Sequence, residues 1–379
     1  MKKIWIVGGE DIHMRLPLLK LLKFRGFDVT AVGTGPGTAF IGNNIPYFEY
    51  KMNRFLSPIS DHQTIKELTN LFIKHKPDVV HGVDTKPAIF TAIAGNKANI
   101  KGIMRTITGM GYIFSSHSPL AFLLKPIYRY LQRKADKFAH LTVFQNPDDQ
   151  DYFVRHNMIT SDRSRLILGS GIDLGSLNKT IITEKIKTDL KQQLGLNNEV
   201  VFLMIARLVK HKGVVEYLKA ARETKLKTNK KTCFLLVGPT TNEGGQAVSL
   251  DTIKKYRDDV VYLGARNDVP VLLTISDVFA LPTYYREGVP RVLMEASVMG
   301  LPLVTTDMPG CREVALDDVT GLIIPPRNST KMADAFVKLA ENKKLRQRLG
   351  AAGSTHIKNG FTLEQVAEQY IQIYNSLIN

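Results

Sequence analysis

Short apolar runs alternate with helical patterns along almost the whole chain, and this alternation restricts the fold more than any other feature. Six runs lie in the first half and six in the second, at residues 4–7, 29–32, 79–83, 103–107, 141–145, 165–168, 200–205, 233–237, 260–263, 278–281, 302–305 and 322–324. Such runs are typical of strands buried on both faces of a parallel sheet, joined by crossover helices. The pattern predicts two doubly wound α/β domains, with ligands at the carboxyl ends of the strands.

Length and composition agree with a globular protein of two or three domains. The chain has 379 residues, of which 44% are hydrophobic and 23% charged, enough for a sizeable core. Two cysteines, Cys233 and Cys311, supply neither a disulfide framework nor a metal-ligand spacing, so a cytoplasmic location is expected. The basic and apolar N-terminus reaches acidic residues too early for a signal peptide, and no uncharged apolar run of about 20 residues follows.

The net charge of +16 favours an anionic partner. Such a charge suits three classes of partner, which are nucleic acid, an anionic membrane surface and phosphorylated ligands. A nucleic-acid partner is not expected, because the sequence lacks basic–aromatic clustering on a sheet and a recognisable reading helix.

The segment Tyr284–Gly300, YYREGVPRVLMEASVMG, combines an anion site with two carboxylates. Pro290 is placed to open a helix, since its missing N–H would be unbonded in the first turn, and apolar residues recur behind it at helical spacing. The amides around Gly288 and Val289 would then point outward at the positive end of that helix. Glu287 and Glu295 would repel phosphate alone but suit a ligand that is part phosphate and part polyol.

The spacing E-G-V-P-x-x-x-x-E-A resembles the donor-sugar signature of retaining glycosyltransferases of family 4, which have the GT-B fold of two facing Rossmann-like domains. Arg207 and Lys212, in ARLVKHKG, resemble the family's R-x-x-x-x-K pair that clamps the donor diphosphate. Within the family, the stretches ARLVKHKG, LGARND and TGMG most resemble bacterial enzymes that add N-acetylgalactosamine to an undecaprenyl-diphosphate-linked sugar.

The resemblance implies a role for each matching residue. Catalytic roles fall to Arg207 and Lys212, which would stabilise charge on departing UDP, and to Glu287, which would hold the transferred sugar. The residues implied to bind the donor are Gly264, Ala265, Arg266, Gly288, Val289, Pro290 and Glu295. No metal and no cofactor is expected, because UDP-sugar is a substrate and two fixed cations neutralise the diphosphate.

The first half supplies less specific candidates. Gly8 and Gly9 follow the first strand, where a tight turn and a phosphate-approach loop that assists donor binding are both open. His13 and Arg15 come next and would face an acceptor anion or solvent. Thr108 and Gly109 match a T-G-x-G-x-x-F stretch found in family members that act on polyprenyl-diphosphate-linked sugars, which implies an acceptor-binding role.

Residues 118–140 combine apolar and aromatic side chains with cations at every fourth position, Lys125, Arg129, Arg133 and Lys137. An anionic bilayer attracts such a segment, although a core helix with a solvated charged face has the same pattern. The expected location is therefore peripheral, on the inner face of the cytoplasmic membrane.

The expected domains are residues 1–174 for the acceptor, residues 175–362 for the nucleotide sugar, and a C-terminal helix in 363–379 that returns to the first domain. The expected activity is transfer of a sugar, N-acetylgalactosamine or another hexose or N-acetylhexosamine, from a UDP-sugar to a polyprenyl-diphosphate-linked saccharide with retention of configuration. A glycosyltransferase with a soluble acceptor and a UDP-sugar epimerase of the same fold are the alternatives.

Overall fold

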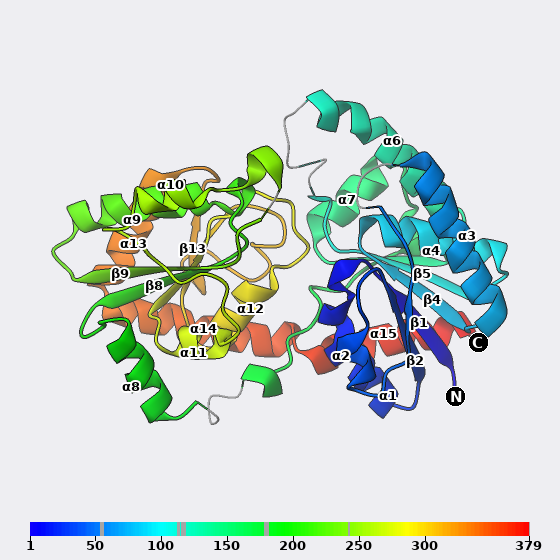
Figure 1. The fold of residues 1–379 in the computed structure, drawn as a ribbon, viewed down its shortest axis with the longest axis horizontal. Helices are drawn as coiled ribbons and strands as arrows, with labels where there is room; N and C mark the ends of the chain where they lie inside the picture. The colour runs from blue at the N-terminus through cyan, green and yellow to red at the C-terminus, as the bar shows by residue number, and fades with distance from the viewer. Residues whose placement is uncertain (54–56, 112–113, 115–118, 178–181, 242, 379) are drawn as a thin grey trace. The chain divides into compact units, whose positions relative to one another are not determined.

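The computed structural model describes residues 1–378 except 54–56, 112–113, 115–118, 178–181 and 242. The chain forms two compact units (Figure 1). Unit 1 comprises Met1–Gly171, Glu287–Val289 and Leu363–Asn379, and unit 2 comprises Ile172–Arg286 and Pro290–Thr362.

In its described part, unit 1 has a parallel sheet of seven strands in the order β3-β2-β1-β4-β5-β6-β7. The strands are β1 (Lys3–Val7), β2 (Asp28–Gly33), β3 (Tyr47–Glu49), β4 (Val79–Val83), β5 (Gly102–Ile107), β6 (Leu141–Phe144) and β7 (Ser164–Leu166). The helices are η1 (Glu10–Arg15), α1 (Leu16–Phe24), α2 (Thr38–Ile41), α3 (Pro58–His75), α4 (Thr85–Lys97), α6 (Pro119–Asp136), α7 (Pro147–Arg155), η2 (Ser161–Arg163) and α15 (Leu363–Ile378).

The sheet of unit 1 is covered on both faces, which explains why its strands are continuously apolar. One face packs against buried side chains of α1 and α15, among them Leu19, Tyr370 and Tyr374. The other face packs against α3 and α4 through residues such as Phe72 and Phe90. Figure 1 shows α15 beside α1, although 338 residues lie between the end of α1 at Phe24 and the start of α15 at Leu363.

The described part of unit 2 repeats the same architecture with six parallel strands in the order β10-β9-β8-β11-β12-β13. The strands are β8 (Val200–Ile205), β9 (Thr232–Val237), β10 (Val261–Tyr262), β11 (Val278–Leu281), β12 (Leu303–Thr306) and β13 (Gly321–Ile324). The helices are η3 (Gly175–Leu177), α8 (Glu184–Gln193), η5 (Lys210–Lys212), α9 (Val214–Lys227), η6 (Gly244–Gln246), α10 (Leu250–Lys254), α11 (Val269–Thr274), α12 (Arg291–Val298), α13 (Ser329–Glu341) and α14 (Lys343–Gly360).

The predicted fold class is confirmed, since each of the twelve apolar runs overlaps a strand and both sheets are parallel. Strand β3 is an addition that the sequence pattern does not predict. It has three residues, none fully buried, and lies at the edge of its sheet beside β2. An edge strand needs no continuous apolar run, because one of its sides has no neighbouring strand.

Candidate functional site

Two loops of unit 2 bring part of the predicted donor site together. Lys212 ends η5, directly before Gly213, whose φ is +79°. A Cβ on Gly213 would lie 2.6 Å from the carbonyl carbon of Pro282, so only glycine allows this close approach. The carbonyl of His211 accepts hydrogen bonds from the Thr283 hydroxyl at 3.1 Å and the Tyr284 amide at 2.9 Å. The Lys212 loop is thereby fixed to the start of the YYREGVP segment.

Arg207 lies two residues beyond β8 and forms an ion pair with Glu243, which directly precedes η6. The Arg207 side chain is 43% exposed and that of Glu243 is 22% exposed. The guanidinium expected to bind a diphosphate is therefore held by an acidic side chain of the same unit.

Helix α12 begins one residue later than the sequence predicts. Pro290 is its N-cap residue and Arg291 its first helical residue, so the proline fixes the entry into the helix without belonging to it. Glu295 accepts a hydrogen bond from Arg291 Nε at 2.9 Å, one turn back along the helix. Its carboxylate is mostly buried, with 17% of the side chain exposed.

The loop after β10 holds the remaining donor candidates of unit 2. Gly264 has a φ of +69°, and its carbonyl accepts a hydrogen bond of 2.8 Å from the Gly238 amide. Ala265 is exposed. Arg266 donates to both carboxylate oxygens of Asp268, at 2.8 and 2.6 Å, and these bonds lower the pKa of Asp268. Arg266 is thus bound within its own loop.

In unit 1, the loop after β1 contains four candidates with different surroundings. A Cβ on Gly8 would lie 2.7 Å from Ile12 Cδ1, whereas one on Gly9 would meet nothing nearer than 3.8 Å. The Gly8 position is therefore closely packed by the side chains of Ile12 and Val83, whereas the Gly9 position is open. His13 is exposed and its Nδ1 lies 3.2 Å from the Glu10 carbonyl. Arg15 is only 8% exposed.

The carboxyl ends of β4 and β5 place a carboxylate next to the predicted acceptor residues. Thr108 Oγ1 donates a hydrogen bond of 2.8 Å to Asp84 Oδ1, and Gly109 has a φ of +130°. Asp84 has a φ of 74° and a ψ of −178°, a conformation that side chains disfavour and that concentrates at functional sites. Asp84 is not among the residues predicted from the sequence, although its place directly after a buried strand was a usable signal.

The segment Glu287–Val289 packs with unit 1. Asn146 Nδ2 donates to the Glu287 carbonyl at 3.1 Å. A Cβ on Gly288 would lie 2.5 Å from the Thr108 carbonyl oxygen and would also collide with Gln145. Within unit 1, the structure therefore groups Glu287 and Gly288 with Thr108, whereas Lys212, Arg207 and Glu295 lie in unit 2.

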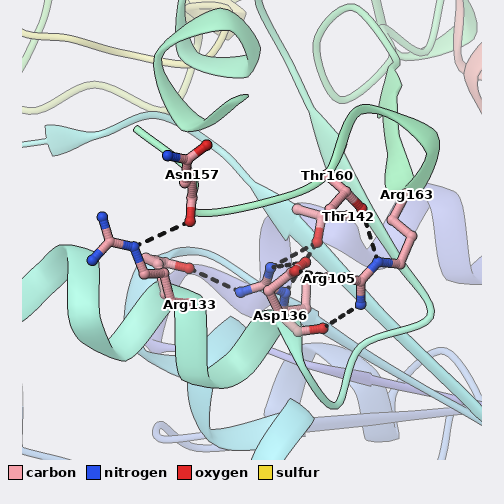
Figure 2. Close-up of polar contacts among 8 residues, drawn as sticks. Arg105, Arg133, Asp136, Thr142, Asn157, Thr160 and Arg163 are labelled. Carbon is pink, nitrogen blue, oxygen red and sulfur yellow. Dashed lines mark hydrogen bonds and ion pairs between the residues drawn. The ribbon is translucent and has the colours of Figure 1, made fainter. Parts of the chain in front are cut away.

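Helix α6 is anchored to unit 1 by buried polar side chains (Figure 2). Arg105, fully buried on β5, donates to Gln132 Oε1 at 2.9 Å, to Thr142 Oγ1 at 2.8 Å and to Asp136 Oδ1 at 3.4 Å. Arg163 pairs with the other Asp136 oxygen at 3.0 Å. Burial lowers the pKa of Arg105 to about 10 and raises the pKa of Asp136, while each charge opposes the shift of the other.

Two cations of the predicted stripe on this segment bind protein rather than pointing freely to solvent. Arg129 donates to the Tyr152 hydroxyl at 3.2 Å, and Arg133 donates to the carbonyls of Asn157 and His156 at 3.1 and 2.9 Å. Periodicity cannot predict this, because α7 comes later in the chain. Residue 118, the first of the predicted segment, lies outside the described residues.

Among the described residues, no group of three or more His, Cys, Asp or Glu side chains is placed to hold a metal ion. Within the same part of the chain, no helix is both long and apolar enough to span a bilayer.

Two family models match separate parts of this chain. The model for glycosyl transferase 4-like proteins matches residues 4–142, and the model for glycosyl transferases group 1 matches residues 186–356. Together with two parallel Rossmann-like sheets and the loops described above, these matches define the class. The chain belongs to the family 4 glycosyltransferases of GT-B fold.

Curated relatives extend over nearly the full length. The chain is 27% identical over 380 residues to the N,N'-diacetylbacillosaminyl-diphospho-undecaprenol alpha-1,3-N-acetylgalactosaminyltransferase of Campylobacter jejuni, covering 98% of this chain and 97% of the relative. It is 25% identical to the UDP-Gal:alpha-D-GlcNAc-diphosphoundecaprenol alpha-1,3-galactosyltransferase of Escherichia coli, covering 97% and 93%.

Solved structures share the fold. A glycosyltransferase from Rickettsia africae superposes with a TM-score of 0.82 at 18% identity, covering 100% of this chain and 99% of that chain. Anabaena HepE, crystallised with UDP and glucose, has a TM-score of 0.79 at 19% identity and covers 99% and 100%. The expected membership of the family is confirmed.

Proposed function

We propose that this glycosyltransferase moves a sugar from a UDP-sugar to a polyprenyl-diphosphate-linked saccharide, with retention of anomeric configuration and without a metal ion. The names of the Campylobacter jejuni and Escherichia coli relatives support the lipid-linked acceptor. The transferred sugar is proposed to be N-acetylgalactosamine or another hexose or N-acetylhexosamine. The observation that carries the donor assignment is the pair of hydrogen bonds from Thr283 and Tyr284 to the His211 carbonyl.

These bonds support a single donor site because they join two segments with complementary chemistry. Lys212 brings a compact cation, and Arg207 a planar guanidinium that can bind two phosphate oxygens at once. Both would stabilise the negative charge that grows on UDP as the glycosidic bond breaks. Glu295 would accept hydrogen bonds from the ribose hydroxyls, and Arg291 holds its carboxylate in place at 2.9 Å.

The remaining donor residues are assigned by their place in these loops. Glu287 is proposed to bind hydroxyls of the transferred sugar, with the backbone of Gly288, Val289 and Pro290 beside it. Gly264, Ala265 and Arg266 are proposed to border the nucleotide base. The turn at Gly8 and Gly9 is proposed to lie near the phosphates of the donor. On the acceptor side, Thr108, Gly109, His13 and Arg15 remain proposals, with Asp84 added by its hydrogen bond to Thr108.

The test is a transfer assay with a panel of UDP-sugars and a short-chain polyprenyl-diphosphate saccharide. We expect one UDP-sugar to be used, with activity retained in EDTA and an α-anomeric product by NMR. Lys212→Ala should lower kcat by about 10²-fold or more, because one stabilising donor is lost. Lys210→Ala removes an exposed cation two residues away and serves as the control. Transfer that requires magnesium, or an inverted product, would contradict the mechanism.

We further propose that α6 binds an anionic membrane. Four large apolar side chains on this helix are exposed, Phe122 by 74%, Leu123 by 67%, Ile127 by 43% and Tyr130 by 62%. The sequence 119–135 contains four cations and no acidic residue. The Arg105 network fixes the opposite face, with Tyr128 and Gln132 buried, so the helix presents these apolar side chains outward.

Vesicle flotation tests this contact. Replacing Phe122 and Ile127 together with serine should weaken binding to vesicles containing phosphatidylglycerol about tenfold or more, since each apolar side chain contributes on the order of 1 kcal/mol when partly buried in lipid. Phe24→Ser is the matched control, because Phe24 is 84% exposed on α1. Equal vesicle binding by the wild type and both variants would show that α6 does not contact the membrane. Absence of any vesicle binding by the wild type would favour a soluble acceptor.

A further inference from the structure

Arg15 is a buried cation without a protein partner in the described part of the chain. It ends η1, forms the N-cap residue of α1, and is 8% exposed. No hydrogen bond or ion pair of its guanidinium occurs among the described residues. The other strongly buried arginine of unit 1, Arg105, shows the usual arrangement, with hydrogen bonds to Gln132, Thr142 and Asp136.

The groups around Arg15 are neutral at physiological pH. His81 lies close enough for Arg15 to help lower its pKa, and burial, the larger cause, brings that pKa to about 3. Tyr370 and Tyr374 on α15 have pKa values raised by burial, and Arg15 acts against that rise. All three side chains are fully enclosed in unit 1. None of them supplies a negative charge to the guanidinium.

The acidic residues of its own element do not compensate the charge either. Glu10 and Asp11 lie in the first turn of η1 and are exposed, and neither forms an ion pair with Arg15 among the described residues. A mostly buried charge without a counter-ion is unfavourable in a folded protein. Such a residue is expected where a ligand supplies the missing counter-ion, and η1 follows the carboxyl end of β1, where ligands of parallel α/β sheets bind.

We infer that Arg15 binds a phosphoryl group of the acceptor and makes the enzyme select acceptors that carry one. A guanidinium can donate two parallel hydrogen bonds to one phosphate, which suits a ligand that must be held in a fixed orientation. The donor also carries phosphates, but its proposed cations, Arg207 and Lys212, lie in unit 2. The inference rests on the proposed glycosyl transfer and deepens its acceptor side.

The first experiment separates acceptor phosphate from donor phosphate. Arg15→Met removes the charge and keeps an unbranched side chain, Arg15→Lys keeps a point charge, and Lys20→Met removes an exposed cation of α1 as the control. For Arg15→Met we expect the KM of a short-chain polyprenyl-diphosphate saccharide to rise about 10- to 100-fold, as for loss of a charged hydrogen-bond partner. Turnover of the same saccharide as a phosphate-free octyl glycoside, and the Kd of UDP, should stay at wild-type values. The KM of Arg15→Lys for the polyprenyl-diphosphate saccharide should lie between the values of the wild type and of Arg15→Met.

The second experiment separates a binding role from a structural one. Removing an uncompensated buried charge should leave the melting temperature of Arg15→Met unchanged or higher, whereas a structural arginine would lower it. Inorganic diphosphate should raise the melting temperature of an Arg207→Ala, Lys212→Ala double variant, in which the proposed donor cations are absent. This rise should disappear when Arg15→Met is added.

Several results would overturn the inference. One is an unchanged acceptor KM together with a lower melting temperature, which would make Arg15 a structural residue. Another is a weakened UDP affinity with an unchanged acceptor KM, which would assign Arg15 to the donor. If the wild-type protein neither binds UDP nor transfers sugar, the proposed function is wrong, and the inorganic diphosphate measurement still decides whether Arg15 binds phosphoryl groups.

Discussion

Replacing His81 should remove a pH dependence from the stability of unit 1. His81 lies on β4 and is buried, with 1% of its surface exposed. Its Nδ1 lies 2.7 Å from the Tyr374 hydroxyl, and its Nε2 lies 2.7 Å from Thr106 Oγ1. Tyr374 belongs to α15, so this bond joins the C-terminal helix to the sheet. Burial, aided by the charge of Arg15, lowers the pKa of His81 from 6.5 to about 3.

The sign follows from proton uptake. Below pH 6.5 the unfolded chain protonates this histidine while the folded protein does not, so stability falls as the pH decreases and stops falling near pH 3. The slope approaches about 1.4 kcal/mol per pH unit. Between pH 7.5 and pH 5, the free energy of unfolding should therefore drop by about 2 kcal/mol through His81 alone.

The chain offers a clean probe for this measurement. Its single tryptophan, Trp5, is 4% exposed on β1, and its register partner on β4 is Val80, next to His81. Tryptophan fluorescence during urea unfolding thus reports on unit 1. We expect His81→Gln to have lower stability than the wild type at pH 7.5 but to lose about 2 kcal/mol less on acidification. His62→Gln, at an exposed site, should behave like the wild type.

Identical pH slopes for the wild type and His81→Gln would refute the reasoning. That result would mean that water or a counter-ion reaches the His81 ring in the folded state, and the neutral surroundings of Arg15 would then need revision.

Two further predictions concern the candidate site. Gly288→Ala should lower kcat/KM at least tenfold, because a Cβ 2.5 Å from the Thr108 carbonyl oxygen must displace the segment that carries Glu287. Gly245→Ala is the control, because a Cβ there meets nothing within 4 Å. Equal kinetics for both variants would contradict the close packing at Gly288. Glu243→Gln should lower the Kd of UDP about two- to fivefold by calorimetry, since the ion pair with Arg207 competes with the diphosphate. The control Asp251→Asn, which removes an exposed acid on α10, should leave the Kd of UDP unchanged. Weaker UDP binding by Glu243→Gln would contradict this prediction and show that Glu243 assists donor binding.

Local patterns were sufficient for the strands and for the loops that follow them. The apolar runs at residues 200–205 and 278–281 coincide with β8 and β11, because a strand buried on both faces needs continuous apolar sequence. Once the strands are known, Arg207, Lys212 and Thr108 necessarily lie near the carboxyl ends of parallel strands. Their positions along the chain therefore follow from short-range information.

Contacts between distant segments were outside the reach of such patterns. Asp84 and Thr108 are 24 residues apart and meet only because β4 and β5 are neighbours in the sheet. The periodic stripe on residues 118–140 predicts a basic helix face for Arg129 and Arg133, directed at a membrane or at solvent, but not the hydrogen bonds that both form with α7 and the turn after it. The sequence shows which side chains a helix face carries but not which element will cover that face.

By itself, the sequence determined the two α/β domains, the family and the positions of the conspicuous loop residues, because each of these depends on residues close together along the chain. Only the tertiary structure decided the electrostatic environment of each charge. Arg15 and Arg105 are the same residue type, yet within the described part of the chain Arg15 is buried without a partner, whereas Arg105 is surrounded by hydrogen-bond acceptors. Burial and pairing are set by β5, α6 and α15 meeting in space, and these elements are far apart in sequence.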